Sequence, residues 1–173
     1  MKTALSLVLV FLGVCAGRAV QQQAQRGPST QEERQRFVAI AHKLEDAPLD
    51  ESLRKEREWG LLWLIQVPDV SVAICTAPLG DFMSKKYKYS PEIVTQLTFS
   101  SGVFVIEHPD EAKDPPAQIL AGVEGALKAY QSILKTNPKA RAKALDDLLE
   151  LQREGKLAEH VRESAAKGCA KKV

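Results

Sequence analysis

Residues 115–138, PPAQILAGVEGALKAYQSILKTNP, carry the clearest structural pattern in the sequence. Large apolar side chains recur there at steps of three or four residues, which places them on one face of an α-helix. These side chains are Ile119, Val123, Leu127, Tyr130 and Leu134. The paired prolines suit the first turn of a helix, and Asn137-Pro138 ends it. The segment therefore predicts a long helix with one face in a core.

A second row in the same helix consists only of small residues. Ala117, Ala121, Gly125 and Ala129 recur at every fourth position. Small side chains let a second helix approach closely. Residues 100–102 (SSG) are also small and are the expected partner of this row.

Helix-start and helix-stop signals divide the rest of the chain. Thr30 opens a capping box with Glu33, and Asp50 precedes a second helical segment. Ser90-Pro91 is typical of a helix start, because proline tolerates the first turn. The predicted fold is all-α, a single compact bundle of about six helices. The expected helices run from Thr30 to Pro48, over 51–66, 91–107 and 115–136, from Pro138 to Gly155, and over 157–166.

Two segments leave an alternative open. Residues 70–75 alternate between apolar and polar, and residues 98–106 (TFSSGVFVI) are rich in strand-forming residues. Two short strands there would make the fold α+β. The helix start at Ser90-Pro91 favours a helix through the second segment.

The second predicted helix ends in a segment that is apolar almost all round, residues 60–67 (GLLWLIQV). Such a segment is expected to be surrounded by other elements. The alternative is a helix that lies on a membrane surface, which would need a basic polar face. Residues 54–58 (RKERE) mix both signs of charge, so burial is favoured. The side chains expected to point inward are Leu53, Leu61, Leu64 and Ile65.

The first nineteen residues have the organisation of a cleaved secretory signal peptide. Lys2 gives a positive start, residues 4–14 (ALSLVLVFLGV) form an apolar stretch, and Ala19 ends a small-x-small cleavage motif. We therefore expect an exported protein, either periplasmic or secreted. Two alternatives remain, an uncleaved N-terminal anchor and lipidation at Cys15.

The mature chain then divides into three parts by composition. Residues 20–29 form a flexible Gln-rich leader, residues 30–166 the helical domain, and residues 167–173 a basic disordered tail. The apolar stretch of the signal is shorter than the roughly 20 residues that a membrane-spanning helix needs, so we interpret it as a cleaved segment. We expect no membrane span in the mature chain.

Charge does not indicate an anionic partner. The whole chain has 24 Lys plus Arg and 22 Asp plus Glu, a formal charge of +2. Lys2 and Arg18 lie in the signal segment, which contains no acidic residue, so the mature chain is formally neutral. A nucleic-acid partner is therefore not expected.

The mature chain keeps two cysteines, Cys75 and Cys169. In an oxidising compartment these two residues are expected to form one disulfide. The alternative is a buried free thiol at Cys75, because free cysteine is among the most buried residue types.

Motifs that carry chemistry are sparse, and no cofactor is predicted. His42 lies three and four residues before Glu45 and Asp46, within reach of a single metal ion on one helix face. One such group is a weak metal candidate, because tight sites need three or four ligands. The sequence has no known catalytic motif, so no catalytic residue is assigned.

The strongest surface pattern interleaves lysines with tyrosines at Lys85, Lys86, Tyr87, Lys88 and Tyr89. Such a patch can bind an anionic envelope component, and the alternative is a solvated loop whose tyrosines pack on a helix. We expect a non-enzymatic exported protein that binds another protein or an envelope component. The alternative is a small metal-assisted or hydrolytic enzyme of the cell envelope.

Overall fold

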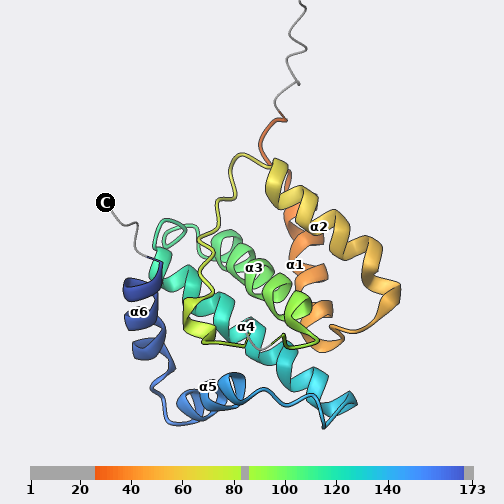
Figure 1. Cartoon of the computed structure of the whole chain (residues 1–173). Helices are drawn as coiled ribbons and strands as arrows, with labels where there is room; N and C mark the ends of the chain where they lie inside the picture. The colour runs from red at the N-terminus through yellow and green to blue at the C-terminus, as the bar shows by residue number, and fades with distance from the viewer. Residues whose placement is uncertain (1–25, 83–85, 170–173) are drawn as a thin grey trace, which may run out of the picture.

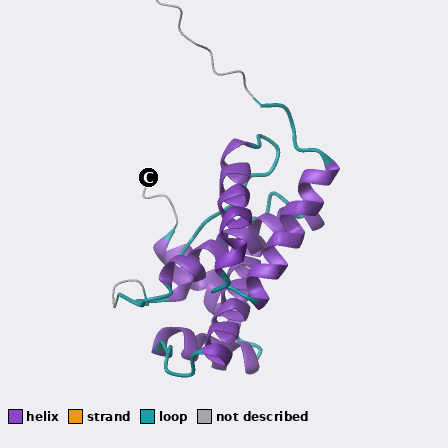
Figure 2. Ribbon diagram, turned by 90° about the vertical axis from the view of Figure 1, so that its right-hand side faces the viewer, coloured by secondary structure: helices purple, strands orange, loops and turns teal. Residues whose placement is uncertain are grey.

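The computed structural model describes residues 26–82 and 86–169, and all regular structure in this part is helical (Figure 1; Figure 2). The prediction of an all-α bundle is confirmed. None of the described helices is long and apolar enough to cross a membrane. The α-helices are α1 (Gln31–Asp46), α2 (Arg54–Gln66), α3 (Ser90–Glu107), α4 (Pro115–Thr136), α5 (Lys143–Arg153) and α6 (Leu157–Gly168). Two short 3-10 helices are η1 (Glu51–Leu53) and η2 (Ala77–Leu79).

The helix ends follow local sequence signals. Thr30 and Glu33 form the predicted capping box at the start of α1. Asp50 accepts a hydrogen bond from the Ser52 amide and caps η1, which leads directly into α2. The Ser90 hydroxyl instead donates to the Tyr87 carbonyl, so α3 begins one residue before its proline. At the other end of the chain, α6 continues to Gly168, into the segment expected to be a disordered tail.

Helices α3 and α4 form the most extensive helix pair of the domain. Gly125 lies so close to α3 that an added Cβ would be 1.8 Å from the Ser100 hydroxyl. An added Cβ at Gly122 would be 2.5 Å from the Ser101 hydroxyl. The Ser101 hydroxyl also lies 3.0 Å from the Gln118 carbonyl oxygen on α4. Of the predicted small row, Gly125 makes the expected contact with Ser100, and Gly122 adds a contact with Ser101, whereas Gly102 lies against Phe37 and Leu64.

The strand-rich composition of residues 98–106 does not produce a strand. The Thr98 hydroxyl donates to the Val94 carbonyl, and the Ser101 hydroxyl lies equally close to the Leu97 carbonyl. These bonds within the helix provide partners for the hydroxyl groups of Thr98, which is half-buried, and Ser101, which is buried. Since α1, α2 and α4 all contact α3, burial on several sides suits its β-branched and aromatic residues.

Residues 70–75 are extended but have no partner strand in the described chain, so the α+β alternative is wrong. The Ala73 amide donates to the side-chain carbonyl of Gln118 at 2.6 Å. Gln118 is buried and donates in turn to the Ala112 carbonyl. The Gln118 side chain of α4 thus accepts from a backbone amide that would bond to a neighbouring strand in a sheet.

The core has two parts that meet at α3. The first joins α1, α2 and α3 around Phe37, whose ring lies 4.8 Å from that of Trp63 and 5.0 Å from that of Phe99. The second joins α3 to α4, α5 and α6 around the predicted stripe of α4. Of that stripe, Leu134 is only partly buried.

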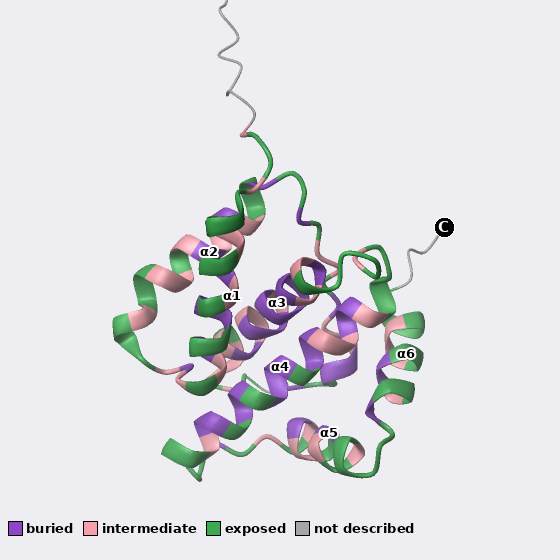
Figure 3. Cartoon of the chain, turned by 180° about the vertical axis from the view of Figure 1, so that it is seen from behind, coloured by how far each residue is buried: buried purple, intermediate pink, exposed green. Residues whose placement is uncertain are grey.

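The predicted burial of α2 holds for one side only. Leu53, Leu61 and Leu64 pack on the core as expected, whereas Ile65 does not. Leu62 is 56% exposed and Ile65 is 78% exposed, although Trp63 between them is buried. Helix α2 packs on α1 and α3 along one side only, and Figure 3 shows exposed and half-buried residues along the other. The all-round apolar sequence therefore includes a face that no described element covers.

A disulfide joins Cys75 to Cys169, as predicted. It links the extended segment before η2 to the end of α6 across a sequence separation of 94 residues. Cys75 is buried, so the bond is anchored in the second part of the core.

Reducing this disulfide is expected to lower the free energy of unfolding by about 4–5 kcal/mol, because a long closed loop restricts the unfolded chain. Urea denaturation with and without reductant measures the loss. The variant Cys75→Ala with Cys169→Ala should match the reduced wild-type chain. An unfolding midpoint unchanged by reductant would contradict the expectation.

Gly125→Ala is expected to destabilise the domain by about 1–3 kcal/mol, because the new methyl group overlaps Ser100. Intrinsic helix propensity alone would predict the opposite sign. Adding Ser100→Gly to the same chain should recover part of the loss in a double-mutant cycle. Gly27→Ala is the control, since nothing lies within 4 Å of its added Cβ.

Candidate functional site

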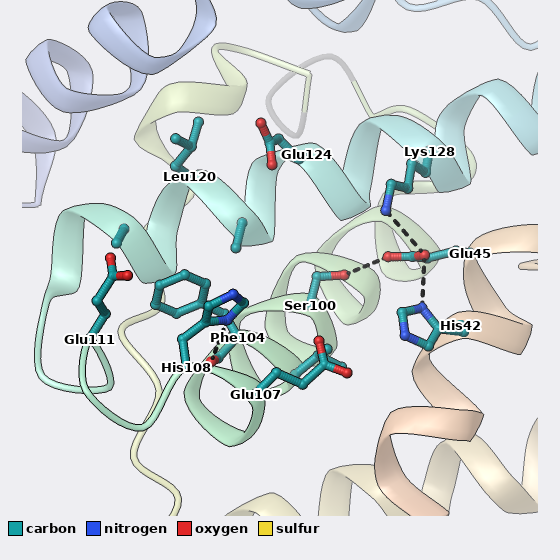
Figure 4. A pocket seen from close by; sticks show the side chains of 13 residues that line it. His42, Glu45, Ser100, Phe104, Glu107, His108, Glu111, Leu120, Glu124 and Lys128 are labelled. Carbon is teal, nitrogen blue, oxygen red and sulfur yellow. Dashed lines mark hydrogen bonds and ion pairs between the residues drawn. The ribbon is translucent and has the colours of Figure 1, made fainter. Parts of the chain in front are cut away.

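A cleft of about 450 Å³ lies between α1, α3 and α4 and is named here the α1/α3/α4 cleft (Figure 4). Its volume lies within the range of ordinary ligand pockets. The lining residues are His42 and Glu45 of α1; Ser100, Val103, Phe104 and Glu107 of α3; His108 and Glu111 of the following loop; and Ala117, Leu120, Ala121, Glu124 and Lys128 of α4.

The floor of the cleft is apolar. Phe104 of α3 and Leu120 of α4 are half-buried, and both line the cleft. Ala117 and Ala121 lie beside them, so the small row that packs tightly at Gly125 leaves open space nearer the start of α4. The cleft is therefore the place where the α3–α4 pair no longer fills its own interface.

One end of the cleft is formed by a nearly buried carboxylate. The side chain of Glu45 is 12% exposed. Its Oε1 accepts a hydrogen bond from the Ser100 hydroxyl at 3.1 Å, and its Oε2 lies 3.2 Å from His42 Nδ1 and 3.5 Å from Lys128 Nζ (Figure 4). Gln96, which is 1% exposed, donates to the Ser100 hydroxyl. These partners offset the cost of removing a carboxylate from water.

The opposite end combines an aromatic stack with exposed acids. The rings of Phe104 and His108 stack with centroids 4.6 Å apart, and His108 Nδ1 lies 3.3 Å from the Phe104 carbonyl oxygen. Glu107, Glu111 and Glu124 also line the cleft and are exposed. Four carboxylates and one ammonium group thus border the cleft, so its potential is negative.

The chain matches no known protein family, no curated protein and no solved structure. What the cleft can bind is therefore inferred from the side chains that line it. An apolar floor with an acidic border accommodates a group that has a hydrocarbon body and a positively charged end.

The structure brings together only part of the predicted metal group. His42 and Glu45 contact each other at the cleft, whereas Asp46 is exposed and does not line it. Among the described residues there is no group of three or more His, Cys, Asp and Glu side chains that could hold a metal ion.

The predicted patch of lysines and tyrosines divides into two kinds of residue. Lys85 lies outside the described residues, and Lys86 and Lys88 are exposed. The Tyr87 hydroxyl donates to the Ala140 carbonyl at 2.9 Å, and the Tyr89 hydroxyl accepts from the Asn137 amide at 3.0 Å.

The Tyr87 ring also makes edge contacts with three other aromatic rings, which are Phe82, Tyr89 and Tyr130. Partial burial, assisted by the neighbouring Tyr130, raises the pKa of Tyr87 well above its usual value. The two tyrosines of the patch therefore pack against the domain, which matches the alternative of a solvated loop.

Sequence reasoning did not single out Phe104, Glu107, Glu111 or Glu124 as site residues. They come from different elements and acquire a common location only when α3 packs on α4. The sequence does contain one signal, because Leu120, Glu124 and Lys128 recur at every fourth position and so share a helix face.

Tyr87→Phe is expected to lower the free energy of unfolding by about 1 kcal/mol, because it leaves the Ala140 carbonyl without its donor. Lys86→Glu and Lys88→Glu should each change it by less than about 0.5 kcal/mol, as is usual for exposed positions. Urea denaturation compares the three variants. Equal stability of Tyr87→Phe and the wild type would contradict a structural role for this tyrosine.

Proposed function

We propose that this chain is an exported, non-enzymatic binding protein whose α1/α3/α4 cleft receives a lysine or arginine side chain of another protein. The observation that carries the proposal is the combination of an apolar floor with four carboxylates around one cleft. Lysine and arginine side chains have the matching form, since a hydrocarbon stem ends in a cation.

The position of each charge supports a cationic guest. Lys128 is paired with Glu45, so the cation of the cleft and its innermost carboxylate compensate each other. No described ion pair engages Glu107, Glu111 or Glu124, which leaves these three carboxylates of the border to act on a ligand. Exposed charges of one sign also increase the rate at which an oppositely charged partner docks.

The openness of the site supports a protein partner rather than a small metabolite. Small-molecule pockets bury most of their ligand's surface. Here Glu107, His108, Glu111 and Glu124 are all exposed, so the border encloses a guest only in part. A side chain presented by a larger partner needs less enclosure, because further contacts form around it.

Export is supported by two independent features of the chain. Residues 1–19, which lie outside the described part, have the pattern of a signal peptide, and the Cys75–Cys169 disulfide is of a kind that persists in oxidising compartments. We therefore propose a periplasmic or secreted location. No structural observation favours the alternative of a metal-assisted or hydrolytic enzyme at His42, Glu45 and Asp46.

The proposal predicts that Nα-acetyl-arginine amide binds the cleft with a Kd on the order of 1 mM, the range expected for so small a ligand. The matched probe is Nα-acetyl-citrulline amide, which has the same shape and no charge. It should bind about threefold to fivefold more weakly, because an exposed ion pair contributes up to about 1 kcal/mol. NMR titration that follows the resonances of Phe104 and His108 measures both affinities.

Two variants complete this experiment. Glu107→Gln with Glu124→Gln should remove the difference between the probes while leaving the fold intact, because both side chains are exposed. Glu154→Gln with Glu163→Gln is the control, since these exposed acids lie away from the cleft. Equal affinity of the wild-type chain for both probes would refute the proposed function.

A further inference from the structure

Phe104 and His108 form a flat aromatic surface in the α1/α3/α4 cleft (Figure 4). Their rings are inclined by only 17°, with centroids 4.6 Å apart. Phe104 is half-buried, whereas His108 is exposed, so the outer face of the pair belongs to the imidazole. In the described chain no second ring lies against His108, which leaves that face to a guest. We name this pair the Phe104–His108 stack.

The end of α3 fixes the orientation of the stack. The His108 amide donates to the Phe104 carbonyl at 2.8 Å, and His108 Nδ1 lies 3.3 Å from the same oxygen. Pro109 follows directly, and a residue before proline is disfavoured in the helical conformation, so α3 ends here. The backbone thus holds the aromatic surface before a ligand arrives, which lowers the entropic cost of binding.

Two carboxylates are tied to the stack by the same short segment. Glu107 immediately precedes His108, and the Glu111 amide donates to the His108 carbonyl at 3.0 Å. Both glutamates line the cleft and are exposed, and neither takes part in a described ion pair. Residues 107–111 therefore combine a flat ring with two negative charges.

A guanidinium group matches this combination better than an ammonium group does. Guanidinium is planar and weakly hydrated, so it can lie on an aromatic ring while its N–H groups point outward in its own plane toward carboxylates. An ammonium group is a compact, strongly hydrated charge without a flat face. Both cations are attracted by the carboxylates, but only guanidinium gains the contact with the ring.

We propose that the Phe104–His108 stack makes the cleft selective for arginine over lysine, with the partner's guanidinium lying on the outer face of the His108 ring. This rests on the proposed function and specifies which cationic side chain the cleft receives. A hydrogen bond to His108 does not give the same preference. Nδ1 faces a carbonyl, so in the neutral ring Nε2 carries the lone pair, and that nitrogen accepts from either cation.

Three capped amino acids separate charge from planarity in the test. Nα-acetyl-arginine amide has both, the matching lysine amide has charge without a flat group, and the citrulline amide has a flat group without charge. We expect the folded wild-type chain to bind the arginine probe about twofold to fivefold more tightly than the lysine probe, the effect of a cation–ring contact at an exposed site. NMR titration measures the three affinities. The δ-methylene protons of bound arginine should also show an upfield ring-current shift.

Substitutions of histidine assign the preference to the stack. His108→Ser should make the affinities for the arginine and lysine probes equal and abolish the ring-current shift. His108→Phe keeps a flat ring without nitrogen atoms and should retain both effects. His42→Ser is the matched comparison, because His42 is also exposed and lines the cleft, but no described ring stacks on it. Its ratio of arginine to lysine affinity should equal that of the wild type. Circular dichroism verifies that each variant is folded.

The outcomes distinguish this inference from the proposed function. If the wild-type chain binds arginine no more tightly than lysine, and both more tightly than citrulline, the selectivity is overturned and the proposed function stands. A preference for arginine that persists in His108→Ser, or that is lost in His108→Phe or in His42→Ser, would also overturn the selectivity. Equal affinity of the wild-type chain for arginine and citrulline would refute both proposals.

Discussion

The architecture depends on the close approach of α3 and α4 at Gly122 and Gly125. Neither position has room for a methyl group, because Ser100, Ser101 and the Leu97 carbonyl occupy the space that a Cβ would need. This contact lets one serine hydroxyl lie within hydrogen-bond distance of carbonyl groups on both helices. With the pair fixed, α3 also contacts α2, α4 also contacts α5 and α6, and α1 contacts both members of the pair. The two parts of the core meet at α3, which contributes buried residues to each.

The same contact positions the candidate site. Ser100 fills the space beside Gly125 and also donates to Glu45, so the carboxylate at the inner end of the cleft is oriented by the residue that sets the helix separation. Nearer the start of α4, Ala117 and Ala121 face Phe104 across open space. The α3–α4 interface is therefore tightly packed at Gly125 and leaves open space at Ala117 and Ala121. The ring of Phe104 on α3 does not fill this space.

The sequence predicted those features that local rules determine. Proline, capping residues and the apolar stripe of α4 fix the helix boundaries and one buried face, and the two cysteines of residues 20–173 allow only one bridge within that part of the chain. Local rules failed where tertiary contacts decide. The apolar sequence of residues 60–67 gave no sign of its uncovered side, because a helix that is apolar all round has no periodicity to indicate one. The strand-forming residues 98–106 became helical because other helices surround them. The cleft escaped prediction because its residues come from three helices and a loop.

Acidic and basic residues balance in number but are not evenly distributed over the folded domain. Residues 20–173 have equal numbers of acidic and basic residues, yet the border of the α1/α3/α4 cleft has four carboxylates and one ammonium group. The balancing basic residues are spread over the rest of the chain. Because the Debye length at physiological salt is about 8 Å, a partner senses these local groups and not the total. A chain with balanced total charge therefore has a cleft bordered mainly by carboxylates, and no residue of α2 lines that cleft.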